Sequence, residues 1–408
     1  MQNDQGFVNR SVFDEQLQYA GGATDLHPAI LRTMCRPHVS PWIEEFKPYY
    51  EDVLASLNKL YQTHQDVLIL MGMIRAGMDA VICSLVEPGD RIIVASNGFW
   101  SDYWIELVES YGGVPVVLRE EWGRPWSAQQ IRSELDRLEG DAKAFCLTHV
   151  ETSTGVVNPP KEIGEIVKER GLLYILDCAQ SLGGMEVKMD EWGADFCIGG
   201  SHKCMSIPAG LAFVGVSEEG WQAIEGREIP IRGRYMNLVH WKHLWAQTPA
   251  RVSFDASLLF ALGSVLDLIF QRTPQEVYRR HRVAAKAIRS GIKELGLDLF
   301  VNCSPCPGCD SPRRFCADTV TVFRYPQDVV HADFARIMSQ QYGIAIGGGI
   351  GKLAGRICRI GPAGLVQILP RNIFALVTSI GLAMRQLGVK VEIQSAIDVV
   401  NRILVQNI

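Results

Sequence analysis

The feature that most constrains this chain is a repeated alternation between short, wholly apolar segments and amphipathic segments of helical periodicity. The apolar segments are Asp66–Met71, Arg91–Ala95, Val114–Leu118, Ala144–Thr148, Leu172–Leu176, Asp195–Ile198 and Leu211–Val216. The helical segments are Ala76–Val86, Asp102–Tyr111, Ser127–Leu138 (with Ser127 as N-cap) and Lys161–Arg170. Strands that are apolar throughout and alternate with helices predict a mostly parallel sheet with helices on both faces.

Residues that directly follow the predicted strands are the candidates for function, because such sheets bind ligands at the carboxyl ends of their strands. These positions are Gly72, Asn97, residues 149–155, Asp177 and residues 199–203.

The last third of the chain has a different pattern. It predicts a long charged helix at Pro274–Leu295, strands at Asp298–Val301, Thr319–Phe323 and Arg356–Ile360, a helix near Ala332–Gln341, a glycine run at Gly347–Gly351 and a last helix from about Arg371. We therefore expect an N-terminal segment (1–45), a large domain (46–270) and a smaller α+β domain (271–408).

Composition excludes several classes of function. The 408 residues carry a net charge of −5, so nothing favours binding to nucleic acid or to anionic membranes. No apolar run reaches 18 residues, and the polar start of the chain does not resemble a secretory signal. Cysteines lie inside apolar runs, as Cys146 and Cys178 do, which favours a reducing compartment and a cytoplasmic location.

Two residues at strand ends suggest a chemistry. Asp177 ends a buried strand and Lys203 follows the next strand candidate. A buried carboxylate needs a cationic partner, which a protonated pyridine nitrogen would provide, and a lysine can form an imine with an aldehyde. Taken singly, Asp177 is better explained as a helix cap and Lys203 as a surface lysine.

Six segments together favour the first interpretation. They are Glu87–Asp90, Ser96–Trp100, Leu147–Gly155, Leu176–Gly184, Gly200–Lys203 and Arg359–Gly361. In order and spacing they resemble the class V aminotransferases among the fold-type I enzymes of pyridoxal 5′-phosphate (PLP), and within that class the alanine–glyoxylate and serine–pyruvate group. The resemblance spans roughly residues 20 to 390. It implies a mostly parallel seven-stranded sheet with helices on both faces, a smaller C-terminal α+β domain, and a homodimer with its sites at the subunit interface.

The resemblance also implies a role for each matching residue. Lys203 would be the Schiff-base lysine and proton carrier, and Asp177 would pair with the pyridinium nitrogen. Trp100 would stack on the outer face of the ring and Ala179 would lie against the inner face. The remaining two are Ser153, which would hydrogen-bond near the phenolic oxygen, and Arg359, which would hold the substrate carboxylate with its guanidinium fork.

The predicted phosphate site departs from the family pattern. The segment Gly72-Met73-Ile74-Arg75 lacks the usual hydroxyl-bearing residue, so we expect Gly72, Met73 and Ile74 to act through backbone N–H groups at a helix start. Gly199 stands where a serine is common, and His202 is the best-matched phosphate contact.

A cysteine cluster has no counterpart in the family. Cys303, Cys306, Cys309 and Cys316 have a spacing that can hold zinc or an iron–sulfur cluster. The alternatives are a disulfide-stapled loop and an unliganded cysteine-rich surface loop, of which we favour the second; a metal there would be structural.

The sequence therefore predicts a PLP-dependent aminotransferase that moves an amino group from a small amino acid such as alanine or serine to a small oxo acid such as glyoxylate or pyruvate. The first alternative keeps the cofactor but makes the chain a lyase, similar to cysteine desulfurases, or a specialised bond-forming enzyme of secondary metabolism. The second is a non-catalytic scaffold, which the presence of Lys203 and Asp177 disfavours.

Overall fold

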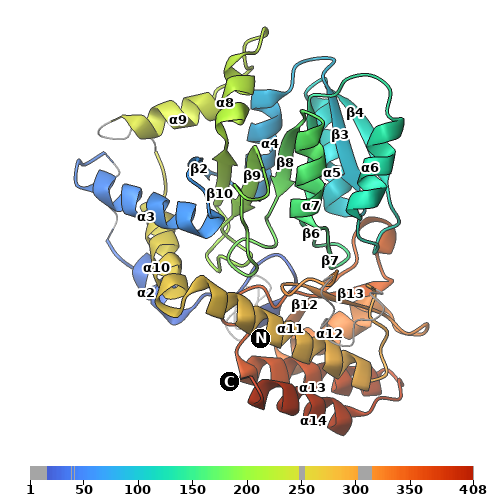
Figure 1. The fold of residues 1–408 in the computed structure, drawn as a ribbon. Coiled ribbons are helices and arrows are strands. Elements are labelled where there is room, and N and C mark those ends of the chain that lie inside the picture. Colours follow the sequence, from blue (N-terminus) through green and yellow to red (C-terminus); the bar gives the residue numbers. More distant parts are fainter. Residues whose placement is uncertain (1–15, 38, 41, 248–252, 302–314, 408) are drawn as a thin grey trace, which may run out of the picture.

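The structure is a computed structural model that describes residues 16–37, 39, 40, 42–247, 253–301 and 315–407. Its largest unit is a seven-stranded sheet with the strand order β2-β10-β9-β8-β5-β3-β4 (Figure 1). The strands are β2 (Asp66–Met71), β3 (Arg91–Ser96), β4 (Val114–Arg119), β5 (Ala144–Thr148), β8 (Leu173–Asp177), β9 (Phe196–Gly200) and β10 (Leu211–Val216). Only β10 runs antiparallel to its two neighbours, so the predicted mostly parallel sheet is confirmed.

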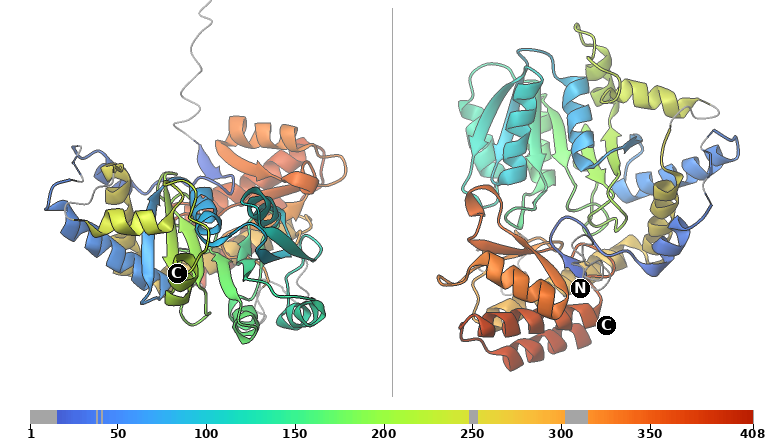
Figure 2. Two further views of the ribbon diagram at one scale, coloured as in Figure 1. Left: turned by 90° about the horizontal axis from the view of Figure 1, so that it is seen from above. Right: turned by 180° about the vertical axis from the view of Figure 1, so that it is seen from behind.

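Helices cover both faces of this sheet, which explains why its strands are apolar throughout. In α4 (Ile74–Leu85), Gly77 lies against Ile198, whereas in α7 (Pro160–Glu169), Gly164 lies against Tyr174. The register pairs Asp177 with Ile198, so Ile198 and Tyr174 are on opposite faces. The ribbon seen from above has helices on both sides of the sheet (Figure 2). The other helices around the sheet are α3 (Phe46–Tyr61), α5 (Phe99–Ser110), α6 (Ala128–Arg137), α8 (Glu218–Glu225) and α9 (Leu238–Ala246).

Local sequence explains the helix starts well. Ser127 caps α6 by accepting a hydrogen bond from the backbone N–H of Gln130, and the Gln130 side chain returns a bond to the Ser127 N–H. This reciprocal pair satisfies two N–H groups that a helix start leaves without partners. The predicted N-cap is confirmed.

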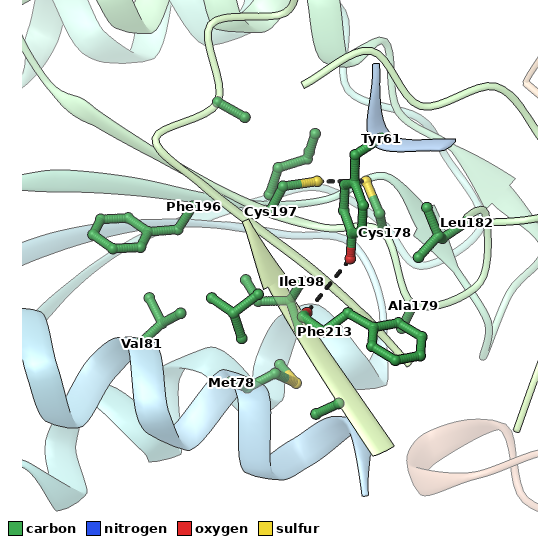
Figure 3. Packing of buried hydrophobic residues seen from close by; sticks show 14 of the residues in the cluster. Tyr61, Met78, Val81, Cys178, Ala179, Leu182, Phe196, Cys197, Ile198 and Phe213 are labelled. Carbon is green, nitrogen blue, oxygen red and sulfur yellow. Dashed lines mark hydrogen bonds between the residues drawn. The ribbon is translucent and has the colours of Figure 1, made fainter. Parts of the chain in front are cut away.

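The sheet core is closely packed next to the strand ends that matter for function. Figure 3 shows Tyr61 beside Cys178, Cys197 and Leu182, with its hydroxyl pointing to the carbonyl of Phe213. Gly199 faces this ring: a Cβ atom there would lie 2.5 Å from both the Tyr61 hydroxyl and Leu182. A serine at position 199 would therefore collide with the core, which explains the glycine at this point.

The C-terminal part contains a second, four-stranded sheet of order β1-β12-β13-β11 (Figure 1). Its strands are β1 (Leu17–Tyr19), β11 (Thr321–Arg324), β12 (Ile344–Gly348) and β13 (Ile357–Ile360). Strand β1 comes from the N-terminal segment and pairs in parallel with β12, an arrangement that the sequence did not predict.

Helices α11 (Pro274–Glu294) and α12 (His331–Tyr342) pack on this second sheet, and α13 (Pro370–Gln386) and α14 (Ile393–Val405) pack against those helices and each other. Two expectations are corrected here. The segment Asp298–Val301 makes one isolated bridge, between Leu299 and Phe323, rather than a strand. The predicted last helix is two helices, separated at Gly388, where a φ of +83° ends α13.

The remaining α-helices of the described residues are the short α2 (Pro28–Met34) and the longer α10 (Ala256–Arg272), on which α2 packs. No single described helix has the length and apolar composition to cross a membrane; α10 and α11 meet those criteria only as a pair, across a bend of 87°.

Candidate active site

A cavity of about 290 Å³ lies where the carboxyl ends of β8 and β9 approach the second sheet. Eight of the ten predicted site residues line it, namely Met73, Ile74, Trp100, Asp177, Ala179, His202, Lys203 and Arg359. They come from helix starts, strand ends and the middle of β13, so the fold gathers residues that are up to nearly three hundred positions apart.

Lys203 is the buried amine of this cavity. Its side chain is 8% exposed, and its Nζ donates a hydrogen bond to Thr152 Oγ1 at 3.1 Å. Burial lowers the pKa of the lysine, although the carboxylate of Asp177 opposes this shift. A lowered pKa makes the neutral, nucleophilic amine easier to reach.

Asp177 ends β8 on the same cavity and is also buried. Its Oδ1 accepts a hydrogen bond from the backbone N–H of Ala179 at 2.8 Å. Burial raises the pKa of Asp177 to about 6, with Lys203 and the Ala179 N–H acting in the opposite direction. A cationic group placed next to it in the cavity would lower the pKa of Asp177 again and favour the carboxylate.

Trp100 and Ala179 both contribute apolar surface to the cavity. Trp100 lies in the first turn of α5, and its ring centre is 5.7 Å from the Nζ of Lys203. Helix α5 packs on β3, β4 and β5, whereas Ala179 follows β8, so the two residues approach the cavity from separate elements.

The start of α4 borders the cavity. Met73 and Ile74 line the cavity together with Arg75, and no side chain in the described structure caps this helix. Gly72 itself is not part of the lining; its φ of +152° and a Cβ position only 2.7 Å from Ala76 mean that glycine is needed to turn the chain into the helix.

His202 lines the same cavity as the start of α4. Burial, reinforced by the charge of Lys203, lowers the pKa of His202 to about 4, so the imidazole is neutral at pH 7. Within the described residues its buried Nδ1 has no hydrogen-bond partner. An unpartnered buried nitrogen on a cavity wall is suited to a polar ligand group.

Ser153 is placed differently from what was expected. Its hydroxyl donates to Glu151 Oε1 at 2.6 Å and accepts from the backbone N–H of Phe99 at 3.0 Å, outside the cavity lining. The hydroxyl that faces the cavity belongs to the preceding residue, Thr152. Residues 152–155 form a turn after Glu151, in which the two neighbouring side chains point in different directions.

Glu151 is a buried residue whose structural importance the sequence prediction missed. Its carboxylate accepts bonds from the backbone N–H groups of Trp100 and Ser101 at the start of α5, at 3.3 and 2.9 Å. It packs so closely that a Cβ atom at Gly98 would lie 2.2 Å away. Glu151 therefore fixes the turn that carries Trp100 into the cavity.

Arg359 reaches the cavity from β13. Its Nε donates to the carbonyl oxygen of Gly348 at 2.6 Å, which leaves its terminal nitrogens available to a ligand. Burial lowers the pKa of this guanidinium, but an arginine remains charged at physiological pH. Arg356, three residues earlier, is exposed and does not line the cavity.

Several other lining residues were not predicted. They are Ala20, Gly21, Gly22, Arg75, Met78, Phe99, Thr152 and Ile350. Gly21 and Gly22 follow β1, and the pairing of β1 with β12, together with the bond from the Gly361 N–H to the Tyr19 carbonyl, brings them here. A strand of three residues leaves no periodic pattern from which this could have been inferred.

The cysteine cluster lies mostly beyond what the structure describes. Cys303, Cys306 and Cys309 are outside the described residues, and Cys316 is buried with Val156 and Val301. In the described parts of the chain no group of three or more His, Cys, Asp or Glu side chains could hold a metal ion. The hypothesis of a metal at this cluster stays a prediction.

The fold and this cavity place the protein among the fold-type I PLP-dependent transferases. A solved structure with the same architecture, the ureidoglycine–glyoxylate aminotransferase of Bacillus subtilis, gives a TM-score of 0.88 at 28% identity and covers 95% of this chain and 98% of its own. The aminotransferase class-V family model matches residues 38–358. The chain belongs to the aminotransferase class-V family, as predicted.

The individual relatives are named after different activities. An uncharacterised aminotransferase of Methanocaldococcus jannaschii is 32% identical over 388 residues, which are 94% of this chain and 96% of the relative. A Synechococcus protein named the small subunit of a soluble hydrogenase is 31% identical over 377 residues, 92% of this chain and 94% of the relative. The assignment of a reaction therefore has to rest on the side chains in the cavity.

Proposed function

We propose that this chain is a PLP-dependent aminotransferase that moves an amino group from a small amino acid, of the alanine or serine type, to a small 2-oxo acid, of the glyoxylate or pyruvate type. One observation carries the proposal: a buried lysine of lowered pKa and a buried aspartate of raised pKa line the same cavity. The similarity to a glyoxylate aminotransferase supports the substrate type.

The side chains of the cavity fit the cofactor at each of its ends. The N–H groups at the start of α4 and the unpartnered Nδ1 of His202 suit a phosphate, and the buried Asp177 suits a protonated ring nitrogen. Trp100 and Ala179 would contact the two faces of the ring, and the Nζ of Lys203 would bond its aldehyde carbon. When bound, the cofactor supplies a ring that accepts the electrons released at the substrate Cα.

The protein residues have distinct tasks in this scheme. Asp177, once paired with a cation, keeps the proton on the ring nitrogen. Once the substrate amine has displaced Lys203 Nζ from the aldehyde carbon, this nitrogen would be free to take the Cα proton and to pass it to that same carbon of the cofactor. Arg359 holds the carboxylate of the amino acid, which orients the Cα–H bond toward the lysine. The two half-reactions at one cavity predict ping-pong kinetics.

A homodimer in the cytoplasm, with the domain boundary near residue 270, completes the proposal. Met73 is 51% exposed although it lines the cavity, which is consistent with a second subunit covering this edge of the site.

The test is spectroscopic and then chemical. Purified protein with PLP should show a yellow imine band that borohydride abolishes, and peptide mapping should place the reduced adduct on Lys203. Alanine plus glyoxylate should then give pyruvate and glycine. Sulfide release from cysteine without amino transfer would replace the proposal by the desulfurase alternative, and the absence of any imine would end both.

A further inference from the structure

A continuous chain of buried hydrogen bonds runs from the cavity to the second sheet. Lys203 Nζ donates to Thr152 Oγ1 at 3.1 Å, and Thr152 Oγ1 donates to Gln180 Oε1 at 3.1 Å. Gln180 Nε2 then donates to the backbone carbonyl of Thr319 at 3.0 Å, just before β11. The side chains of Thr152 and Gln180 are 2% and 1% exposed, so water does not compete for these bonds.

The hydrogen bond to Thr319 determines which group donates and which accepts along this series of bonds. A carbonyl oxygen can only accept, so the amide nitrogen of Gln180 has to face Thr319, and the amide oxygen has to face Thr152. A second bond holds the same alignment, because the Thr319 hydroxyl donates to the backbone carbonyl of Gln180 at 2.7 Å. The orientation of the Gln180 amide is therefore determined by backbone atoms.

The consequence reaches the lysine through Thr152. A hydroxyl has one hydrogen, and Thr152 uses it on the amide oxygen of Gln180. What remains toward Lys203 is a lone pair, which can accept from the lysine but cannot donate to it. An acceptor in this place favours the protonated ammonium over the neutral amine.

We propose that Gln180 is a positioning residue: by holding the Thr152 hydroxyl in one orientation, it makes Thr152 a fixed acceptor for the Nζ of Lys203 whenever that nitrogen carries a proton. This inference rests on the proposed function of Lys203. Gln180 touches neither the cavity nor the lysine, and it acts only through Thr152. Because Thr319 lies just before β11, the orientation of the Gln180 amide depends on the position of the second sheet.

Other charged groups around Lys203 do not replace this effect. Asp177, Cys204 and Glu151 favour the protonated lysine and Arg359 disfavours it, but none of these side chains bonds to the Thr152 hydroxyl. His202, the neighbour in sequence, is neutral at pH 7 because its pKa lies near 4. A change at Gln180 leaves all of them in place.

The experiment measures the pH at which Lys203 becomes reactive. Full-length, cofactor-free chain is mixed with PLP across neutral to alkaline pH, and the rate of appearance of the borohydride-reducible imine band gives the half-maximal pH. Gln180→Met has an unbranched side chain of similar length but no amide oxygen to accept the Thr152 hydroxyl hydrogen. The hydroxyl can then rotate and donate a hydrogen bond to the neutral amine of Lys203. The half-maximal pH should fall by about one unit, the scale of one hydrogen bond to a charged group.

Further variants separate positioning from loosened packing. Thr152→Val should shift the half-maximal pH in the same direction, and Thr152→Ser should restore it. Gln180→Glu keeps an oxygen toward Thr152, so its half-maximal pH should not fall below that of the unsubstituted chain. Ser181→Ala is the matched control, because this buried neighbour bonds to Cys178 and His149 and should leave the value unchanged.

The double variant decides the proposal. If Gln180 acts through Thr152, adding Gln180→Met to Thr152→Val should produce no further shift. Additive shifts, or an unshifted Gln180→Met single variant, would overturn the role of Gln180 while leaving the proposed function intact. A chain without substitutions that forms no imine at Lys203 would instead overturn the proposed function, and this inference with it.

Discussion

The two sheets contribute to the cavity in different ways. The seven-stranded sheet presents Asp177 and Lys203 at or just after the ends of adjacent strands, where buried hydrogen bonds hold them. The four-stranded sheet presents Arg359 from the middle of an antiparallel strand, held through one backbone carbonyl. The comparison suggests that the first sheet determines how the cofactor is attached, whereas the second determines how the substrate is captured. Variants in the two sheets should therefore separate these two properties.

The largest effect is expected from Lys203→Ala in the first sheet. Without the amine, neither imine formation nor proton transfer at Cα has a group to perform it, so the rate of amino transfer should fall by at least about 10³-fold. Absorbance and steady-state assays measure both properties. The matched control is Lys161→Ala, an exposed lysine paired with Glu191, which should keep the imine band and the rate.

The next effect concerns stability and comes from Asp177. Burial raises the pKa of this carboxyl from its ordinary value of 3.8 to about 6, so between these pH values the folded, cofactor-free chain holds a proton that the unfolded chain has lost. The free energy of unfolding therefore decreases as the pH rises through this window. Asp177→Asn should remove this decrease and stabilise the cofactor-free chain at pH 7 by roughly 3 kcal/mol.

Urea denaturation of the cofactor-free chain at pH 7 and near pH 4 measures this prediction. The gain should be much smaller at the lower pH, where the carboxyl is protonated. With PLP bound, the order should reverse, because the asparagine no longer compensates a protonated ring nitrogen. An equal effect at both pH values would show that the buried charge is not the cause.

Arg359→Lys tests the second sheet. Lysine cannot form the two parallel bonds that a guanidinium makes with a carboxylate, so the KM for the amino donor should rise by about 10- to 100-fold. The imine band and its half-maximal pH should change little. Arg356→Lys, on the same strand segment but exposed, is the control. A loss of the imine band in Arg359→Lys would break the proposed division between the two sheets.

The smallest effect is expected at Gly348, whose carbonyl holds Arg359. A Cβ atom there would lie 2.6 Å from Nε2 of His331, so Gly348→Ala should displace the end of β12 and with it the guanidinium. We expect a rise in KM of roughly three- to tenfold with an unchanged imine band. Steady-state kinetics on the pair Gly348→Ala and Gly348→Ala with His331→Ala would sharpen this result, since the second change makes room for the added methyl group.

The same contrast governs what could be predicted from the sequence. The large sheet was predicted almost strand by strand, because its inner strands, such as β5 and β9, are buried on both faces and therefore apolar, and the edge strand β4 is apolar as well although it is less buried. Asp177 and Lys203 were candidates because of their places at strand ends, but the resemblance gave them, and Arg359, their roles. Arg359 lies inside β13 and Arg356 directly before it, and nothing local shows which of the two faces the cavity.

Within the site, the sequence did not show in which direction individual side chains point. Thr152 and Ser153 are adjacent hydroxyl residues, and which of them faces the cavity depends on the demand of the buried Glu151 for donors. The role of Gln180 depends on the carbonyl of Thr319, 139 residues away. Neither contact leaves a trace in local composition or periodicity.

Strand β1 has a consequence for how the protein is made. The N-terminal strand finds its partner, β12, only after more than three hundred further residues have left the ribosome, and even the Gln16 side chain bonds to Ser339, 323 positions later. Gly21 and Gly22, which form part of the cavity wall, take their places only when β1 pairs with β12. The large sheet can therefore assemble during synthesis, whereas a complete binding cavity forms late and slowly, and this step is the one most exposed to aggregation or to help from chaperones.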